Sequence, residues 1–571
     1  MKKSLLPLLM VPVLAANATA AEPQTPKSYD GYVLSAISPN GKFAASDCYG
    51  MVVYINLETG AEITFTPDDN GNSMYCLGSG NALSNDGLMM CSQDMNGDAS
   101  YFDGTEWKAL HIGDTNGVNS AANAVTPDGS RICGNLGLRE MTYDDVTMCV
   151  PVIWNRQSDG SFGEYVMLPH PDLDLFGTAP QYVTATHISD DGHTVLGQVT
   201  DSRGFVLYPI LYKEAADGTW SYSLPFADLF NPDHIVVPEN PGEGPKQPEA
   251  KDFMTDEQKA AFDQAVADWQ TGGFQGDYPD ENDYLSEAAK AELEQALAEW
   301  QTAHAEWSER WSAFDDAYWA VASSSPTFES NQNALASDGS AFAATNVTED
   351  DSDPMAWMPV QVYHPWTYDI ASGQITKYED KSMGITGYAG GYWLATETDP
   401  ETSCYNGYML KNGSVTSLYD FLCSKGDPVK EWVEVNMNHQ IESFDYETEQ
   451  VVTKDFIVTG LPHATPDLRY IISWTFDAWN QTFEPVSYLF DLGVGVAISE
   501  TFADKKAAAF DADGNLVLGA DVKAVAIYDL AGRCVKNAAA QTVACGDLAD
   551  GVYIVNVTYA DGTAASVKVA K

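Results

Sequence analysis

Residues 187–197, "HISDDGHTVLG", decide the fold because altered copies of them recur along the chain. Each copy has a small residue or histidine, an apolar residue, Ser, Thr or Ala, a variable residue, Asp or Asn, Gly, and a mostly apolar run. The other copies are at 36–46, 82–92, 124–134, 334–344 and, weaker and without the glycine, 463–473. Such self-similarity is typical of solenoids and propellers.

Each position of the repeat has a reason in backbone chemistry. The Ser or Thr oxygen can bond the amides of its own turn, Asp or Asn tolerates the turn conformation, and Gly supplies a positive φ. The pattern therefore predicts a tight hairpin between two short strands. On this interpretation Asp190 and Asp191 are turn residues, and His187 is a framework residue where other copies carry Ala. Only His193 occupies a variable position.

Further strands follow each hairpin. The segment "MVVYINLETGAEITF" at 51–65 alternates apolar and polar residues into and out of a Thr-Gly turn. Four strands per repeat make one propeller blade, and the first four copies start 46, 42 and 63 residues apart, which suits one blade per repeat. A degenerate unit at 384–399 makes a seventh. We therefore expect a mainly β chain with a β-propeller of about seven blades over 28–500, six or eight being the alternatives.

The Ser-x-Asp-Gly hairpins, each followed by a strand bearing Trp or Tyr and an x-Gly turn, resemble the extracellular repeats of bacterial secreted β-propellers. The resemblance implies a rigid exported scaffold. It does not imply one activity, because propellers host both enzymes and binding proteins.

An insertion at 231–325 interrupts the repeats with a Pro/Gly/Glu-rich segment and two amphipathic helices. Thr255 and Gln258 have the spacing of a capping box and mark the start of the first helix, and the second helix runs from about 286 to 321. We expect an antiparallel helical hairpin zipped together by an aromatic stripe. The alternative is a partner-binding surface, because the second helix is longer than the first. The candidate aromatic residues are Trp300, Trp307, Trp311 and Tyr318.

The first residues predict export. Two lysines, an apolar run and the Ala18-x-Ala20 signature are typical of a secretory signal peptide over 1–20, cleaved between Ala20 and Ala21. No later segment reaches the roughly 18 apolar residues of a transmembrane span. We expect a protein without a transmembrane span that is secreted or attached to the outer-membrane surface.

The tail at 503–571 alternates apolar residues in "AVAIYDL", "GVYIVNV" and "SVKVAK", which predicts a small Ig-like β-sandwich. These residues closely resemble the C-terminal sorting domain of cargo proteins of the type IX secretion system of Bacteroidetes. The resemblance implies delivery by the type IX secretion machinery; the alternative is an ordinary terminal sandwich. The matching residues are Tyr528, Asp529, Gly532, Arg533, Gly551, Tyr553 and Lys568.

The charge excludes one class of partner. With 29 basic and 82 acidic residues the chain has a formal charge of −53, so nucleic acid would repel it. Nine cysteines are too few for a disulfide scaffold, and their odd number leaves at least one unpaired. Pairings between neighbours, such as Cys76 with Cys91 and Cys133 with Cys149, remain open.

No motif nominates a catalytic residue: the chain has no nucleophile elbow, zinc-protease helix or Walker loop. Calcium is the one cofactor with a candidate site, since Asp94, Asn96 and Asp98 place oxygens at alternate positions of a loop. The loop is not an EF-hand, because its glycine is fourth and no Glu stands twelfth. The alternative is a solvated turn.

These observations favour an exported propeller that binds a glycan or protein ligand over an enzyme. The competing hypothesis is an extracellular hydrolase or lyase with acidic residues at the channel mouth. Two carboxyl groups about 5 to 10 Å apart in the central pocket would favour that hypothesis. A purely structural surface component is the third possibility.

Overall fold

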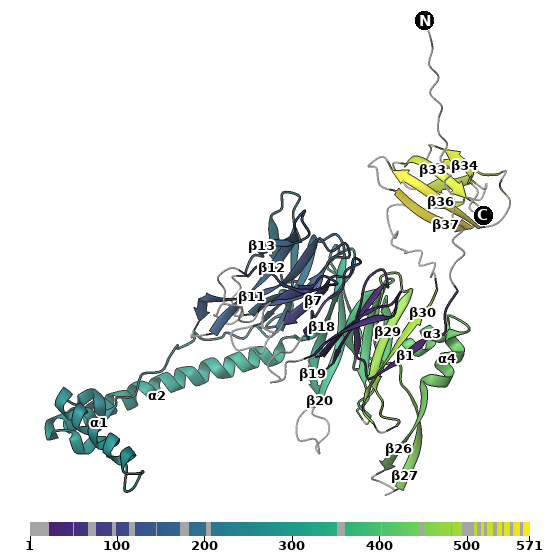
Figure 1. Cartoon of the computed structure of the whole chain (residues 1–571). Helices are drawn as coiled ribbons and strands as arrows, with labels where there is room; N and C mark the ends of the chain where they lie inside the picture. The colour runs from purple at the N-terminus through teal and green to yellow at the C-terminus, as the bar shows by residue number, and fades with distance from the viewer. Residues whose placement is uncertain are drawn as a thin grey trace.

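The chain folds into a β-propeller with two insertions, followed by a small β-sandwich (Figure 1). This computed structural model describes residues 22–493 and 508–570 with internal gaps. The gaps are 49–50, 67–75, 94–98, 113–119, 144–145, 172–181, 201–206, 351–359, 401, 446–449 and 481 in the propeller, and 511–514, 519–521, 529–533, 539–541, 547, 549–551 and 560–563 in the sandwich.

Seven blades of four strands each make up the described propeller. Five are separate four-stranded sheets, and the third and fourth blades form one eight-stranded sheet through a parallel pairing of Cys149 with Tyr182. The first blade contains β2 (Leu34–Ile37), β3 (Phe43–Cys48), β4 (Met51–Asn56) and β5 (Ala61–Phe65), and the second contains β6 (Cys76–Leu77), β7 (Met89–Gln93), β8 (Ser100–Phe102) and β9 (Trp107–Ala109). The third contains β10 (Ala121–Val125), β11 (Arg131–Tyr143), β12 (Val146–Arg156) and β13 (Phe162–Met167), and the fourth contains β14 (Tyr182–Ile188), β15 (Thr194–Thr200), β16 (Leu207–Glu214) and β17 (Trp220–Ser223). The fifth contains β18 (Thr327–Leu335), β19 (Ala341–Asp350), β20 (Val360–Asp369) and β21 (Ile375–Lys377), the sixth contains β22 (Gly384–Ala389), β23 (Tyr392–Thr398), β24 (Tyr405–Lys411) and β25 (Ser414–Ser417), and the seventh contains β28 (Leu461–Ala464), β29 (Tyr470–Phe476), β30 (Pro485–Asp491) and β1 (Lys27–Asp30).

The seventh blade closes the ring, because its outer strand β1 comes from the start of the chain. β1 pairs antiparallel with β30, with Lys27 opposite Leu489 and Asp30 opposite Val486. The first and last blades are also linked by a hydrogen bond from the Leu34 amide to Ser487 Oγ, at 2.9 Å. Closure leaves no gap between the first and last repeats, as the expected propeller requires.

The repeated turns adopt the predicted chemistry. In the fourth blade Asp191 Oδ1 accepts hydrogen bonds from Ser189 Oγ and from the His193 amide, at 2.6 and 3.0 Å, and Gly192 has a φ of +75°. In the last copy, which lacks the glycine, Leu468 takes that position with a φ of +57°. The aspartates are thus turn residues, and the hairpin prediction is confirmed.

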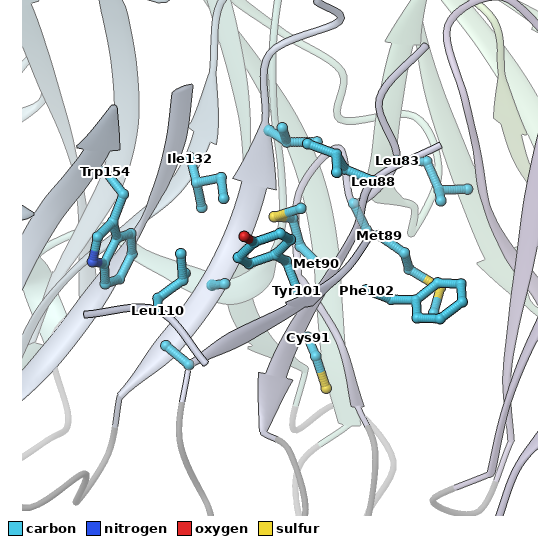
Figure 2. Packing of buried hydrophobic residues seen from close by; sticks show 14 of the residues in the cluster. Leu83, Leu88, Met89, Met90, Cys91, Tyr101, Phe102, Leu110, Ile132 and Trp154 are labelled. Carbon is cyan, nitrogen blue, oxygen red and sulfur yellow. The ribbon is translucent and has the colours of Figure 1, made fainter. Parts of the chain in front are cut away.

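Apolar side chains fill the spaces between blades. Figure 2 shows part of the cluster shared by the first three blades, where Met89, Phe102 and Trp154 are each at most 1% exposed. The Trp154 indole also donates a hydrogen bond of 2.8 Å to the His111 carbonyl. Burying a side chain of this size removes a large apolar area from water, which stabilises the blade interface.

The first insertion, between β17 and β18, is helical as predicted. Its elements are η1 (Ala227–Leu229), η2 (Ala250–Phe253), α1 (Asp256–Thr271), η3 (Glu281–Tyr284) and α2 (Glu287–Ser324). Thr255 and Gln258 form the expected capping box. The 38 residues of α2 span about 57 Å, so this helix projects away from the propeller and carries α1 at its far end (Figure 1).

The tryptophans of α2 do not pack between the two helices, which corrects the expected packing. α1 meets only the start of α2, where Phe262 packs with Ala289 and Leu293. The Pro-rich segment instead lies along the middle of α2: Trp300 Nε1 donates to the Pro245 carbonyl and Trp307 Nε1 to the Gly242 carbonyl, at 2.8 and 2.9 Å. A Pro/Gly-rich extended chain has no internal hydrogen bonds, so its carbonyls can accept from the indoles.

A second insertion, between β25 and β28, was not expected from the sequence. It contains α3 (Leu418–Cys423), α4 (Val429–Asn436) and a two-stranded ribbon of β26 (Asn438–Asp445) and β27 (Gln450–Ile457). Leu422 and Val433 of the helices are fully buried in one cluster with Ile471 and Phe490 of the seventh blade. The helices therefore belong to the propeller core.

The tail forms the expected small β-sandwich. One sheet contains β31 (Ala508–Phe510), β32 (Asn515–Leu518) and β35 (Thr542–Ala544), and the other contains β33 (Val522–Tyr528), β34 (Cys534–Ala538), β36 (Val552–Tyr559) and β37 (Ala564–Ala570). Leu516 from the first sheet and Ile527 and Val555 from the second are fully buried together. Over the described parts of the chain, no helix is both long and apolar enough to cross a membrane.

Candidate functional site

The first strands of the blades surround a cavity of about 430 Å³, which we call the axial cavity. Among the described residues, those lining the cavity come from six of the seven blades and none from the third. The wall combines hydroxyl, amide, imidazole, carboxyl and aromatic groups. The residues that carry these groups are Ser35, Asp47, Ser79, Asn81, His187, Asp190, Ser337, Thr386, Tyr388, His463 and Trp474.

Two histidines line the axial cavity at equivalent positions of the repeat. His187 in the fourth blade and His463 in the seventh replace the small residue found elsewhere, such as Ala36 or Ala334. Burial lowers the pKa of both imidazoles to about 4, so both are neutral at pH 7. A neutral imidazole offers one hydrogen-bond donor and one acceptor. His187 Nδ1 lies 3.0 Å from Thr186 Oγ1.

The two carboxyl groups of the axial cavity lie at its opposite ends. Asp190 is in a hairpin turn and is exposed, but partial desolvation of its carboxyl, with Asp191 and Asp338 nearby, raises its pKa to about 6. Asp47 lies at the far end of β3, where its amide donates to the Val33 carbonyl and burial raises its pKa. Val33, which Asp47 faces, and Pro39, which stands at the repeat position of Asp190, are six residues apart, so roughly 20 Å of extended chain separates the two levels. Asp47 and Asp190 are therefore not a closely spaced acid–base pair.

A segment of the second blade reaches past the third blade to the fourth and lines the axial cavity. The Gly80 amide donates to the Asn123 carbonyl at 3.0 Å, and a Cβ on Gly80 would lie 2.1 Å from the Thr186 carbonyl oxygen. Only glycine permits this approach. A second cavity, of about 540 Å³, shares Leu77 and Ser79 with the first. It is lined otherwise by Asn123, Asn135, Thr184, Thr186, Gln198, Thr200, Ser330 and Asn331.

Polar residues just before the repeat link neighbouring blades, and our sequence interpretation missed them. Asn123 Nδ2 donates to the Ala185 carbonyl at 2.8 Å, and Thr386 Oγ1 donates to the Pro462 carbonyl at 2.8 Å. The strand register shifts at both positions, so each residue is an extra one in its strand. The signal was present, since this position is polar in six blades: Ser35, Asn81, Asn123, Thr186, Asn333 and Thr386.

His193, whose role the sequence left open, joins two blades at the rim. Its Nδ1 lies 2.7 Å from Glu214 Oε2, and Arg131 of the third blade binds the same carboxylate. Arg131 also donates to the Gly192 carbonyl at 2.9 Å. His193 does not line either cavity, so the contacts of this residue are structural.

The aromatic candidates of α2 differ in accessibility. Trp300 and Trp307 are half-buried under the Pro-rich segment, and the half-buried ring of Trp311 stacks on Trp307 with centroids 5.6 Å apart. Tyr318 is 1% exposed and packs in the core beside Phe328. Partner binding by these four residues stays a prediction.

Several other candidates lie outside the described residues. These are the calcium candidates Asp94, Asn96 and Asp98, the cleavage residues Ala20 and Ala21, and the sorting-motif residues Asp529, Gly532, Arg533 and Gly551. Tyr528 ends β33, Tyr553 is 7% exposed in the sandwich core, and Lys568 pairs with Ile554. Within the described ranges no group of three His, Cys, Asp or Glu side chains is placed to hold a metal ion.

The strand register excludes one of the cysteine pairings. Cys133 lies opposite Ile153, and Cys149 lies opposite Gly137. The two cysteines are therefore four residues apart along the ladder, about 13 Å. This exceeds the Cα separation that a disulfide can bridge, so the pairing of Cys133 with Cys149 is wrong.

The cavity histidines are expected to make stability depend on pH. An imidazole with a pKa of about 6.5 in the unfolded chain and about 4 in the folded chain binds fewer protons when folded. Its contribution is complete above pH 6.5 and is lost as the pH falls towards 4. The pKa of Asp190 is raised, so this residue acts in the opposite sense between pH 3.8 and about 6.

Replacing His187 and His463 by alanine, the residue of other blades, is therefore expected to reduce the loss of stability between pH 6.5 and about 4.5. Urea unfolding across this range would measure the slope for the variant and the unaltered protein. Equal slopes would show that neither imidazole is held neutral by burial.

The sequence matches no protein-family profile and no curated protein. Solved structures similar to this chain include the β-propeller domain of the Trilobed protease from Pyrococcus furiosus, at 7% identity and a TM-score of 0.27, covering 85% of this chain and 99% of that one. The polysaccharide lyase Uly1 is 10% identical with a TM-score of 0.34, over 84% of this chain and 91% of that one. The GH74 xyloglucanase from Xanthomonas campestris is 11% identical with a TM-score of 0.33, over 87% and 60%. Likeness with TM-scores this low carries no argument about activity, and the fold rests on the strand pairing described above.

Proposed function

We propose that this chain is an exported β-propeller binding protein that takes a glycan in its axial cavity. The observation that carries the proposal is the cavity wall, which combines neutral hydrogen-bonding groups with aromatic rings and keeps its two carboxyl groups at opposite ends. Its volume of about 430 Å³ falls within the usual range for small-molecule sites.

A glycan fits this chemistry better than a charged ligand. Each sugar hydroxyl both donates and accepts hydrogen bonds, as do the neutral imidazoles of His187 and His463. Tyr388 and Trp474 offer apolar ring surface with a polar edge. Ser35 Oγ is buried in the wall and has no hydrogen-bond partner among the described residues. Rotation of the Ser35 side chain towards the cavity would let a ligand hydroxyl satisfy this buried group.

Replacing Ser35 by alanine is expected to weaken glycan binding by about three- to tenfold, the value of one hydrogen bond, while leaving stability unchanged or slightly higher. Calorimetry of the mature protein, with a glycan selected from an array, would measure both effects. Ser473→Ala is the matched control, because Ser473 Oγ is also buried with no partner in the described part of the chain but does not line the cavity. Equal affinity in both variants, or no glycan ligand at all, would refute the proposal.

The hydrolase or lyase remains the second candidate, favoured by one observation. Asp190 lines the cavity with a pKa raised to about 6, which suits a general acid at neutral pH. The same binding experiment decides between the two, because an enzyme would convert the bound glycan to shorter products and a binding protein would leave it intact.

We also propose delivery by the type IX secretion machinery to the medium or the outer-membrane surface. The signal-peptide pattern at 1–20 and the sorting-domain residues within 503–571 support this proposal. In a host with that system, a chain lacking 503–571 should remain in the periplasm, whereas export of the shortened chain would refute the sorting role.

A further inference from the structure

The loop between α1 and η3 lies at the far end of the helical insertion (Figure 1). Two of its aromatic side chains are exposed. Phe274 is 64% exposed and Tyr278 is 55% exposed. Both rings stand edge-on to the ring of Trp269, with centroids 4.8 and 5.2 Å away. We call Trp269, Phe274 and Tyr278 the arm tip. Large apolar side chains grouped in the open mark interaction surfaces.

The arm tip is held in one conformation. Trp269 Nε1 donates to the Gly276 carbonyl at 3.2 Å, and the Phe274 amide donates to the Trp269 carbonyl at 3.1 Å. Tyr278 also meets the buried ring of Phe262, with centroids 6.3 Å apart. Phe274 has a φ of +61°, which a bulky residue rarely adopts. A surface fixed in advance loses little conformational freedom when a partner binds.

Acidic residues outnumber basic ones around the arm tip, where the cation beside it is Lys251, whose Nζ lies 4.7 Å from the centroid of the Phe262 ring and 3.7 Å from Asp263 Oδ1. No lysine or arginine occurs from 260 to 289. α1 ends at the arm tip with no basic residue in its last turn, so the negative end of the helix dipole is left uncompensated. The acidic residues in and beside the loop are Asp268, Asp277, Asp280, Glu281 and Asp283.

We propose that the arm tip is a docking surface for a cationic segment of a partner protein. Lys or Arg side chains would lie over the exposed rings and between the surrounding carboxylates, which combines cation–π attraction with charge complementarity. A second copy of this chain is the wrong occupant, because its formal charge of −53 would oppose approach. The proposal is independent of any ligand in the axial cavity.

The test must separate the arm tip from the general acidity of the chain, which attracts any polycation. Replacing both Phe274 and Tyr278 by alanine removes the rings without changing the charge. A short peptide rich in Lys and Arg is expected to bind this variant of the full mature chain at least about fivefold more weakly than the unaltered chain. Fluorescence anisotropy of the labelled peptide would measure both affinities, and an unchanged melting temperature would show that the fold is intact.

Phe483→Ala is the matched control. Phe483 is also an exposed phenylalanine, at 58%, and has a positive φ of +54°, but it lies in the loop before β30 of the seventh blade. Its replacement is expected to leave peptide affinity unchanged. Equal affinity of the arm-tip variant and the unaltered chain, an equal loss in the control, or no binding of the peptide to any of the three would overturn the proposal.

Discussion

Replacing Gly80 by alanine is expected to lower the free energy of unfolding of the propeller by about 3 kcal/mol, the upper part of the range for overpacking. The new Cβ would lie 2.1 Å from the Thr186 carbonyl oxygen, a backbone atom that cannot turn aside. The segment would have to move, which also threatens the hydrogen bond from the Gly80 amide to the Asn123 carbonyl. Chemical denaturation followed by tryptophan fluorescence would measure the loss.

Gly387→Ala is the control for the Gly80 variant. Gly387 occupies the repeat position where Ala36 and Ala334 stand in other blades, and a Cβ there would meet only Leu394 Cδ1 at an ordinary 3.6 Å. Neither glycine has a positive φ, so backbone strain does not distinguish them. We expect the Gly387 variant to be as stable as the unaltered protein or slightly more so. Equal losses in the two variants would contradict the close approach at Gly80.

Trp154→Ala is expected to cost about 3 to 5 kcal/mol, the usual range for removing a large buried aromatic side chain. Trp154 is fully buried between blades, among the side chains in Figure 2, and its loss also leaves the His111 carbonyl without its indole donor. Trp319→Ala serves as the comparison, because Trp319 on α2 is 41% exposed and should cost much less. The same denaturation experiment applies, and similar losses in both variants would refute a central role for Trp154.

Local chemistry explains which parts of the fold the sequence predicts. A Ser-x-Asp-Gly turn is stabilised by hydrogen bonds between residues of the turn itself, as those of Asp191 show. Each copy of the repeat therefore predicts its hairpin independently of the others. The capping box at Thr255 is equally local. The last copy of the repeat forms its hairpin even without the glycine, because Leu468 adopts the positive φ at that position.

The candidate site was less predictable, because the repeat identifies equivalent positions without saying what faces them. Aligning the copies places His187 and His463 at one framework position, but only the closed ring directs both toward the same cavity. The tryptophans of α2 illustrate the same limit. The periodicity of these tryptophans predicts that they form a buried stripe. Whether α1 or the Pro-rich segment buries that stripe depends on the relative lengths of the two helices.

The sequence alone determined the hairpin repeat, the helical insertion and the terminal sandwich, because each depends on turns, caps and periodicities read over a few residues; it left the number of blades at about seven, with six or eight as alternatives. Only the tertiary structure decided that β1 closes the last blade, that Gly80 brings the second blade against the fourth, and that Asp47 and Asp190 lie at opposite ends of one cavity. These features depend on approaches between residues far apart in the chain, which local pattern does not encode.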